Sequence, residues 1–105
     1  MEIITFVVTG ELAHQDSTGE RGTLRYGDIQ VMSAGRGIEH SEFNASAEEP
    51  VQFIQIWVEP AQRGGEPSYQ QRFIEPSNGL SLLVSPDGAD DSLIIRQDAS
   101  IYRGV

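Results

Sequence analysis

The sequence predicts an all-β protein of the sandwich or barrel class. Short runs rich in β-branched and aromatic residues alternate with clusters of Gly, Pro, Asp and Ser, at intervals of roughly 8–12 residues, which is typical of sandwiches and barrels. No window of a dozen residues keeps an apolar period of about 3.6 without a Gly or Pro, so no helix is expected.

The strands are expected in the following order. Residues 2–14 and 23–26 flank the turn sequence DSTGERG, and Gly10 ends the first apolar run. DIQVM follows Gly27 as a short strand, and the two glycines of AGRGIEH predict a tight bend. The later expected strands are VQFIQIWVEP, YQQRFIE, LSLLVS, SLIIRQD and ASIYRG, with PDGADD as a turn.

The first strand raises a question about its neighbours. Residues 2–8 are apolar on both faces, which indicates a strand buried on both sides, yet nothing upstream can pair with it. We therefore expect an exposed strand edge there, and with it pairing between copies as a homo-oligomer or a domain swap.

Composition excludes several classes of partner. The 105 residues carry 16 acidic and 7 basic side chains, a net charge of −9, and no cysteine. The few basic residues are scattered, so neither direct nucleic-acid binding nor adhesion to anionic lipid is expected. Without cysteine there is no disulfide and no thiolate metal site. With no signal peptide or membrane span in the sequence, a cytoplasmic protein is expected.

His40 and Glu42 are the candidate metal ligands. They lie two residues apart in an extended segment and therefore project to the same side. An imidazole nitrogen and a carboxylate oxygen suit a divalent transition metal such as Fe, Mn, Ni, Cu or Zn. Two donors alone are a weak signal, and a surface histidine beside an acidic residue is the competing interpretation.

The segment GDIQVMSAGRGIEHSEFN resembles the second metal-binding motif of the cupins, in the form it takes in the pirin family. The matching positions are Gly27, Gly35, Gly37, His40 and Asn44. The resemblance continues through FIQIWVEP, YQQRFIE, LLVSPDG and IRQDASIYRG, in the family's order. It implies a cupin-like β-barrel, with His40 and Glu42 as two of four protein ligands to a non-haem metal, commonly iron.

The same resemblance implies an incomplete site. In the family the other two ligands form a His-x-His pair, expected within about six residues before Met1, so this chain is expected to be truncated or to have a misplaced start. Residues 1–105 would then be one partial N-terminal cupin domain of a bicupin. Residues from about 92 to 105 resemble the entry to the second cupin domain.

The resemblance implies two functions, and the missing ligands add a third hypothesis. The first is a quercetin 2,3-dioxygenase-type oxidoreductase acting on a small aromatic substrate such as a flavonol, impaired here by the missing ligands. The second is a non-catalytic regulatory protein that binds a transcription factor. The third is an inactive truncated fragment.

Other polar residues have simpler interpretations. His14 is expected at a hairpin end, bonded to Asp16 or solvent, with a ligand role as the minor alternative. Glu2 either faces the metal pocket as an outer group or is a solvated carboxylate at the chain end. Arg36 and Glu39, beside the bend, are expected to form a surface ion pair, with contact to a ligand as the alternative.

The strand VQFIQIWVEP has one face made of alternate residues. Phe53 and Trp57 on that face are expected in the core, as a barrel interior requires. Gln55 between them is the exception and is a candidate for lining a polar pocket. The acidic pairs around Asp87 and Asp90 lack the spacing of a calcium loop and are better explained by a turn.

Overall fold

A computed structural model confirms the all-β prediction. It describes residues 1–17, 19, 21–35, 37, 40–62, 64–76 and 79–104, with His40 described by its backbone alone. The elements are β1 (Glu2–Thr9), β2 (Glu11–Asp16), β3 (Arg21–Arg25), β4 (Asp28–Ser33), β5 (His40–Asn44), β6 (Gln52–Val58), β7 (Ser68–Phe73), β8 (Leu80–Ser85), the short 3₁₀ turn η1 (Ala89–Asp91), β9 (Leu93–Ile94) and β10 (Ile101–Gly104).

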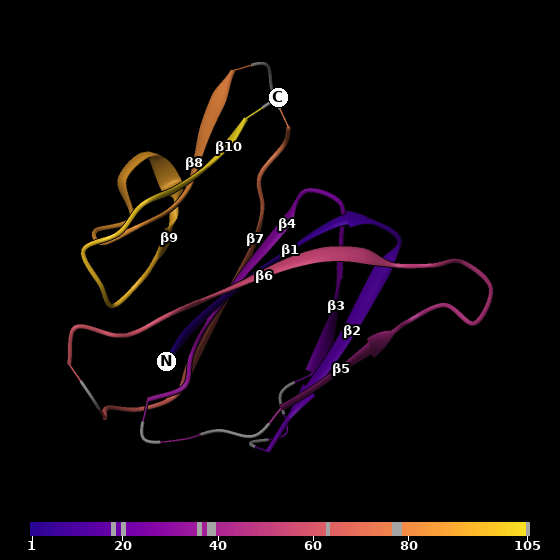
Figure 1. The fold of residues 1–105 in the computed structure, drawn as a ribbon, viewed down its shortest axis with the longest axis horizontal. Coiled ribbons are helices and arrows are strands. Elements are labelled where there is room, and N and C mark those ends of the chain that lie inside the picture. The colour runs from indigo at the N-terminus through magenta and orange to yellow at the C-terminus, as the bar shows by residue number, and fades with distance from the viewer. Residues whose placement is uncertain are drawn as a thin grey trace.

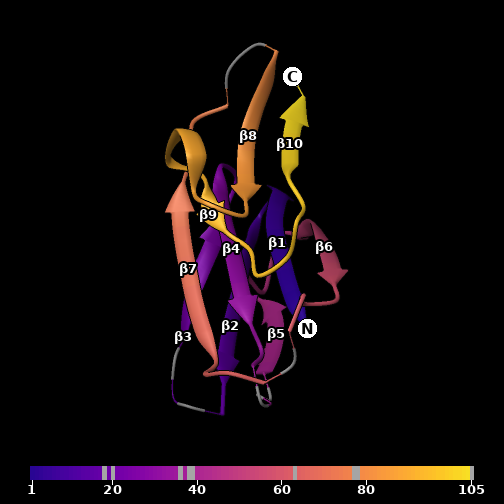
Figure 2. The same cartoon turned by 90° about the vertical axis from the view of Figure 1, so that its left-hand side faces the viewer.

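The strands form three sheets. A central sheet has the order β6-β1-β4-β7, and two three-stranded sheets have the orders β3-β2-β5 and β10-β8-β9. The two smaller sheets lie on opposite sides of the central strands (Figure 1). Figure 2 views the molecule from the side of β8, β9 and β10. We call the face of the central sheet toward β8–β10 the C-terminal face, and the face toward β2, β3 and β5 the inner face.

The first strand is central, so the expectation of an exposed edge at residues 2–8 is wrong. β1 pairs antiparallel with β4 on one side and with β6 on the other. Both neighbours come from later in the chain, and such long-range pairing leaves no trace in the local sequence. The premise for pairing between copies through this strand is therefore removed.

The C-terminal face of the central sheet carries the larger apolar core. Ile4 lies opposite Val31 in the β1–β4 ladder, and both are fully buried. They pack against the β10-β8-β9 sheet and the residue that follows β9, because the same cluster contains Leu83, Val84, Leu93 and Ile95. Ile56 and Val58 of β6 pack against this cluster from the edge of the sheet.

The inner face carries a smaller apolar cluster of Val7, Leu12 and Leu24, with Val51 packed against it. The chain passes from β1 in the central sheet to β2 in the adjacent one at Gly10. A Cβ at this position would lie 2.4 Å from the Pro50 carbonyl oxygen, and φ is +81°. Glycine therefore permits the close backbone approach that brings the two sheets together.

The acidic segment after β8 forms a turn, as the sequence predicts. Asp87 Oδ1 accepts hydrogen bonds from the Ala89 backbone N–H at 3.1 Å and from Ser85 Oγ at 3.3 Å. These are the bonds of a turn closed by a short polar side chain. The strand expected over SLIIRQD is shorter than predicted, because only Leu93 and Ile94 pair with β8.

Candidate functional site

The two sequence-predicted ligand positions lie on β5, against β2. The ladder places Glu42 opposite His14 and His40 opposite Asp16. Residues directly opposite each other in a sheet share a face, as do positions two apart. These four positions therefore belong to one face of the β3-β2-β5 sheet. The side chain of His40, and the whole of Arg36 and Glu39, lie outside the described part of the chain.

A row of polar residues crosses the central sheet on its inner face. The ladders align Gln55 with Thr5, Thr5 with Gln30, and Gln30 with Gln71. Each buried polar atom in such a row requires a hydrogen-bond partner. The three glutamines find partners on the opposing sheet, namely Glu42, His14 and the Thr23 carbonyl, whereas Thr5 is bonded to Gln55 within the row.

Gln55 connects this row to Glu42. Its Nε2 donates to Glu42 Oε1 at 2.5 Å and to Thr5 Oγ1 at 3.2 Å. Its Oε1 accepts a hydrogen bond from Trp57 Nε1 at 2.8 Å. The half-buried Glu42 carboxylate is thus held from the facing sheet, and Gln55 lies in a polar site rather than in the apolar core.

His14 is a second connection between the sheets, which corrects the expectation of a solvated hairpin end. It lies within β2 and is buried, with a relative exposure of 7%. The Gln30 amide nitrogen donates to its Nε2 at 3.1 Å, and its ring stacks on Tyr69 at 5.9 Å between centroids. The other ring nitrogen, Nδ1, is buried and has no hydrogen-bond partner among the described residues. Alternation along β2 turns His14 inward, and the facing sheet buries it.

Trp57 and Phe53 are exposed, so the expectation that they belong to the core is wrong. Their relative exposures are 58% and 40%. β6 is an edge strand of the central sheet, and β5 is an edge strand of the sheet opposite. Because no ladder joins these two edges, the aromatic side chains on the inner face of β6 remain open to solvent on either side of Gln55.

Glu2 matches neither expectation. It is 1% exposed, and its Oε1 accepts hydrogen bonds from Ser33 Oγ at 2.9 Å and from the Arg96 backbone N–H at 2.8 Å. Glu2 and Thr5 lie on opposite faces of β1, because their positions differ by an odd number. Glu2 thus stabilises the C-terminal face and is remote from the polar layer.

The donors on the inner face suit a transition metal in kind. Glu42 offers a carboxylate held by Gln55, and the register of β5 puts position 40 on the same strand face as position 42. A carboxylate and an imidazole are donor types found in transition-metal sites. Within the described residues, no group of three or more His, Asp or Glu side chains is arranged to hold a metal ion. The described part of the chain therefore supplies a partial donor set.

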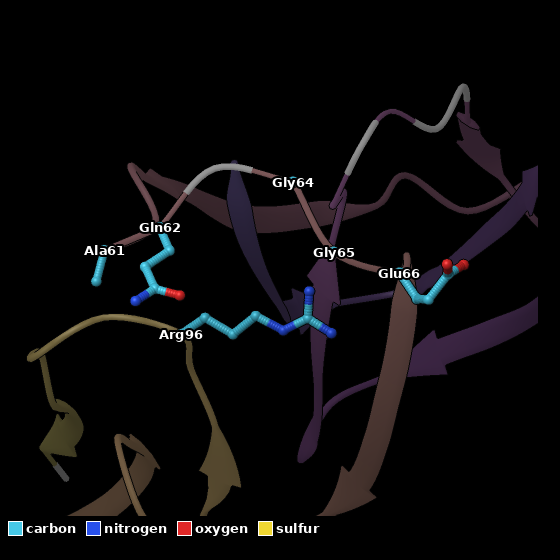
Figure 3. Close-up of a pocket in the computed structure, with 6 residues that line it drawn as sticks. All are labelled: Ala61, Gln62, Gly64, Gly65, Glu66 and Arg96. Atoms are coloured by element: carbon cyan, nitrogen blue, oxygen red, sulfur yellow. The ribbon is translucent and has the colours of Figure 1, made fainter.

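A separate pocket of about 450 Å³ lies between the β6–β7 loop and the segment after β9. Figure 3 shows the Arg96 side chain extending beneath Gly64 and Gly65, with Glu66 at the far end. Its other described lining residues are Ala61 and Gln62. Neither His40 nor Glu42 is among the residues described there, so the pocket is distinct from the polar layer.

Sequence reasoning missed Thr5, Gln30 and Tyr69 as members of the polar layer. A signal was present for the first two, because each is a polar residue with apolar residues on both sides in the middle of its strand. Tyr69 gave no such signal, since a tyrosine in a strand is ordinary. It contacts His14 only because the central sheet and the β3-β2-β5 sheet lie face to face.

The chain resembles several known proteins along nearly its whole length. Quercetin 2,3-dioxygenase of Escherichia coli K12 is 45% identical over 103 residues, which cover 98% of this chain and 45% of that protein. A pirin-like protein of Caulobacter vibrioides is 43% identical over 105 residues, covering 96% of this chain and 45% of that protein. The chain thus spans a little under half the length of the curated relatives it matches.

The solved structures agree with the sequence comparison. The crystal structure of the bacterial pirin YhhW from Escherichia coli, in complex with nickel(II), superimposes with a TM-score of 0.93 at 43% identity. The match covers 99% of this chain and 44% of that one. The all-β strand arrangement and this structural similarity define a cupin-like β protein.

The Pirin family profile matches residues 1–58, the segment from β1 through β6 that contains both candidate ligand positions. This chain belongs to the pirin family.

Among the described residues, no helix is long and apolar enough to cross a membrane.

Proposed function

We propose that this chain contributes His40 and Glu42 as ligands of a divalent transition metal, in a site that oxidises a flavonol-type substrate with O₂. The observation that carries the proposal is the Gln55–Glu42 hydrogen bond, which holds a half-buried carboxylate between the two sheets, at the position to which the family resemblance assigns a ligand. Relatives named quercetin 2,3-dioxygenase support the reaction class. The proposed metal is iron, on the family resemblance.

The chain's own residues have defined parts in this proposal. Gln55 fixes one oxygen of Glu42, so the carboxylate meets an ion in one orientation. When bound between His40 and Glu42, such an ion would supply Lewis-acid and redox chemistry to an oxygen of the flavonol. The remaining protein ligands of the metal are proposed to come from the part of the full-length relatives that this chain does not span.

The exposed aromatic residues of β6 suit a planar substrate. Phe53 and Trp57 flank Gln55 on the inner face and present large apolar surfaces beside the Glu42 carboxylate. Aromatic rings associate by offset stacking or edge-to-face contact. We propose that these two side chains form the wall on which the substrate's rings lie.

Metal content tests the ligand assignment. Because the chain carries only two of the proposed ligands, it is expected to bind added divalent metal weakly in equilibrium dialysis, whereas His40→Ala and Glu42→Gln are expected to bind none. The control is Glu49→Gln, an exposed carboxylate on the β5–β6 connection. Equal metal in all four proteins would remove the site from His40 and Glu42.

Consumption of a flavonol tests the reaction. With added Fe(II) and O₂, the chain is expected to deplete quercetin faster than the Glu42→Gln variant does. Because the metal assay is independent, a chain that binds metal without consuming flavonol would refute the oxidation while leaving the metal ligands in place.

A further inference from the structure

The Gln55 side chain has a single permitted orientation. An indole N–H only donates, so the amide oxygen of Gln55 must face Trp57. A carboxylate only accepts, so the amide nitrogen must face Glu42. The nitrogen's second hydrogen is directed to Thr5 Oγ1. Reversing the amide would break all of these contacts.

These contacts connect the half-buried Glu42 carboxylate to the solvent-exposed indole of Trp57. Trp57 lies two residues after Gln55 on the same strand face and is more than half exposed, whereas Glu42 lies on the facing sheet and is half-buried. No strand ladder joins β5 to β6, so the Gln55 amide is a direct hydrogen-bonded link across this open side. A displacement of Glu42 therefore changes the hydrogen bond that Trp57 can make.

We propose that Gln55 is a positioning residue that couples metal binding at Glu42 to the conformation of the Trp57 indole. The inference rests on the proposed metal site and goes beyond it, because it assigns a task to two residues that do not ligate the ion. In the metal-bound state Gln55 holds Glu42 for the ion and Trp57 for an aromatic ligand. Binding of either ligand then raises the affinity for the other by the same factor.

A purely structural Gln55 would behave differently. If the amide only joins the two sheets, its removal lowers stability but leaves the Trp57 environment insensitive to metal. If the amide is a positioning residue, its removal disconnects the indole from the ion. Trp57 is the only tryptophan in the chain, so its fluorescence reports this contact without labelling.

The experiment is a Zn²⁺ titration of the full chain, followed in parallel by tryptophan emission and by calorimetry. Zn²⁺ has a filled d shell and no redox chemistry, so an emission change reports the indole's surroundings rather than metal quenching. In the unsubstituted chain, the emission is expected to shift with the same midpoint as the binding heat. In Gln55→Leu, Zn²⁺ is expected to bind about tenfold more weakly, with no emission shift.

Two controls separate the links. Thr5→Val keeps the shape of the side chain but removes the hydroxyl that Gln55 also contacts, and it is expected to retain the emission response. Glu42→Gln is expected to lose both heat and shift. If Gln55→Leu does not fold, Trp57→Phe takes its place, because it removes the indole N–H donor and keeps an aromatic ring at the position. It is expected to weaken Zn²⁺ binding roughly threefold by calorimetry.

The outcomes distinguish the inference from the function beneath it. If Zn²⁺ produces no binding heat in the unsubstituted chain, the proposed metal site fails and the coupling with it. If Zn²⁺ binds but the emission is unmoved, or moves equally in Gln55→Leu, the coupling is overturned while the metal site stands. An unchanged Zn²⁺ affinity in Trp57→Phe would also overturn it.

Discussion

The two faces of the central sheet differ in what they bury. The C-terminal face joins Ile4, Ile29 and Val31 to four apolar residues of the C-terminal segment, and its one buried carboxylate, Glu2, is hydrogen-bonded. The inner face packs against a smaller apolar cluster of Val7, Leu12 and Leu24, and beside the buried Ile3 and Met32 it carries the polar layer around Gln30 and Gln55. The first arrangement is suited to stability. The second replaces part of the apolar packing with hydrogen-bonded polar side chains.

The largest expected effect comes from truncating the apolar cores. Ile4→Ala should lower the free energy of unfolding by about 4 kcal/mol, because it opens a cavity in the larger cluster. Leu12→Ala on the inner face should cost less, about 2.5 kcal/mol, because its smaller cluster can collapse around the gap. Urea denaturation measures both, and equal losses would mean that the two faces contribute alike.

The next effect concerns Gly35, which lies in the bend that carries the chain from β4 of the central sheet toward β5. A Cβ on Gly35 would lie 2.4 Å from the Gly65 carbonyl oxygen, and φ is +58°. Since the neighbour is backbone and cannot rotate away, Gly35→Ala should cost about 3 kcal/mol. It should also reduce metal retention, because the bend precedes His40.

Gly104→Ala is the matched control for that bend. Its Cβ would meet Leu80 Cδ2 at an ordinary 3.5 Å. The stability of this variant should change by less than about 1 kcal/mol. A comparable loss at both glycines in thermal melts would contradict the strain assigned to Gly35.

A smaller effect is expected at the buried carboxylate of the C-terminal face. Glu2→Ala leaves the Ser33 hydroxyl and the Arg96 N–H without their acceptor, at a cost of about 2 kcal/mol. Glu2→Gln keeps an accepting oxygen and should cost less. Metal content should be unchanged in both variants, since Glu2 faces away from the polar layer. Loss of metal from Glu2→Gln would place this residue in the site after all.

The smallest effect tests whether the inner polar layer is needed for folding. The double variant His14→Phe/Gln30→Leu removes both partners of one hydrogen bond, together with the buried Nδ1 that has no partner in the described part of the chain. It should be within about 1 kcal/mol of the unsubstituted chain, because no buried polar atom of that pair remains. Gln30→Leu alone should be less stable than the double variant. The reverse order in denaturation would show that the histidine stabilises the fold by itself.

The sequence by itself determined the all-β class, most strand positions, the family and the shared face of His40 and Glu42. These follow from local alternation, turn residues and a motif, all of which are properties of short segments. It also singled out Gln55 as a polar residue on an otherwise apolar strand face. It misjudged Trp57, because alternation tells which side chains share a face but not whether another sheet covers that face.

Only the tertiary structure determined which strands are neighbours and which side chains are in contact. It placed β1 between β4 and β6, buried His14 against Gln30, and brought the Arg96 N–H to Glu2 across 94 residues of sequence. It also joined Glu42 to Gln55 and left the neighbouring indole open to solvent. The physical reason is that burial depends on long-range pairing of strands and sheets, which no local pattern records.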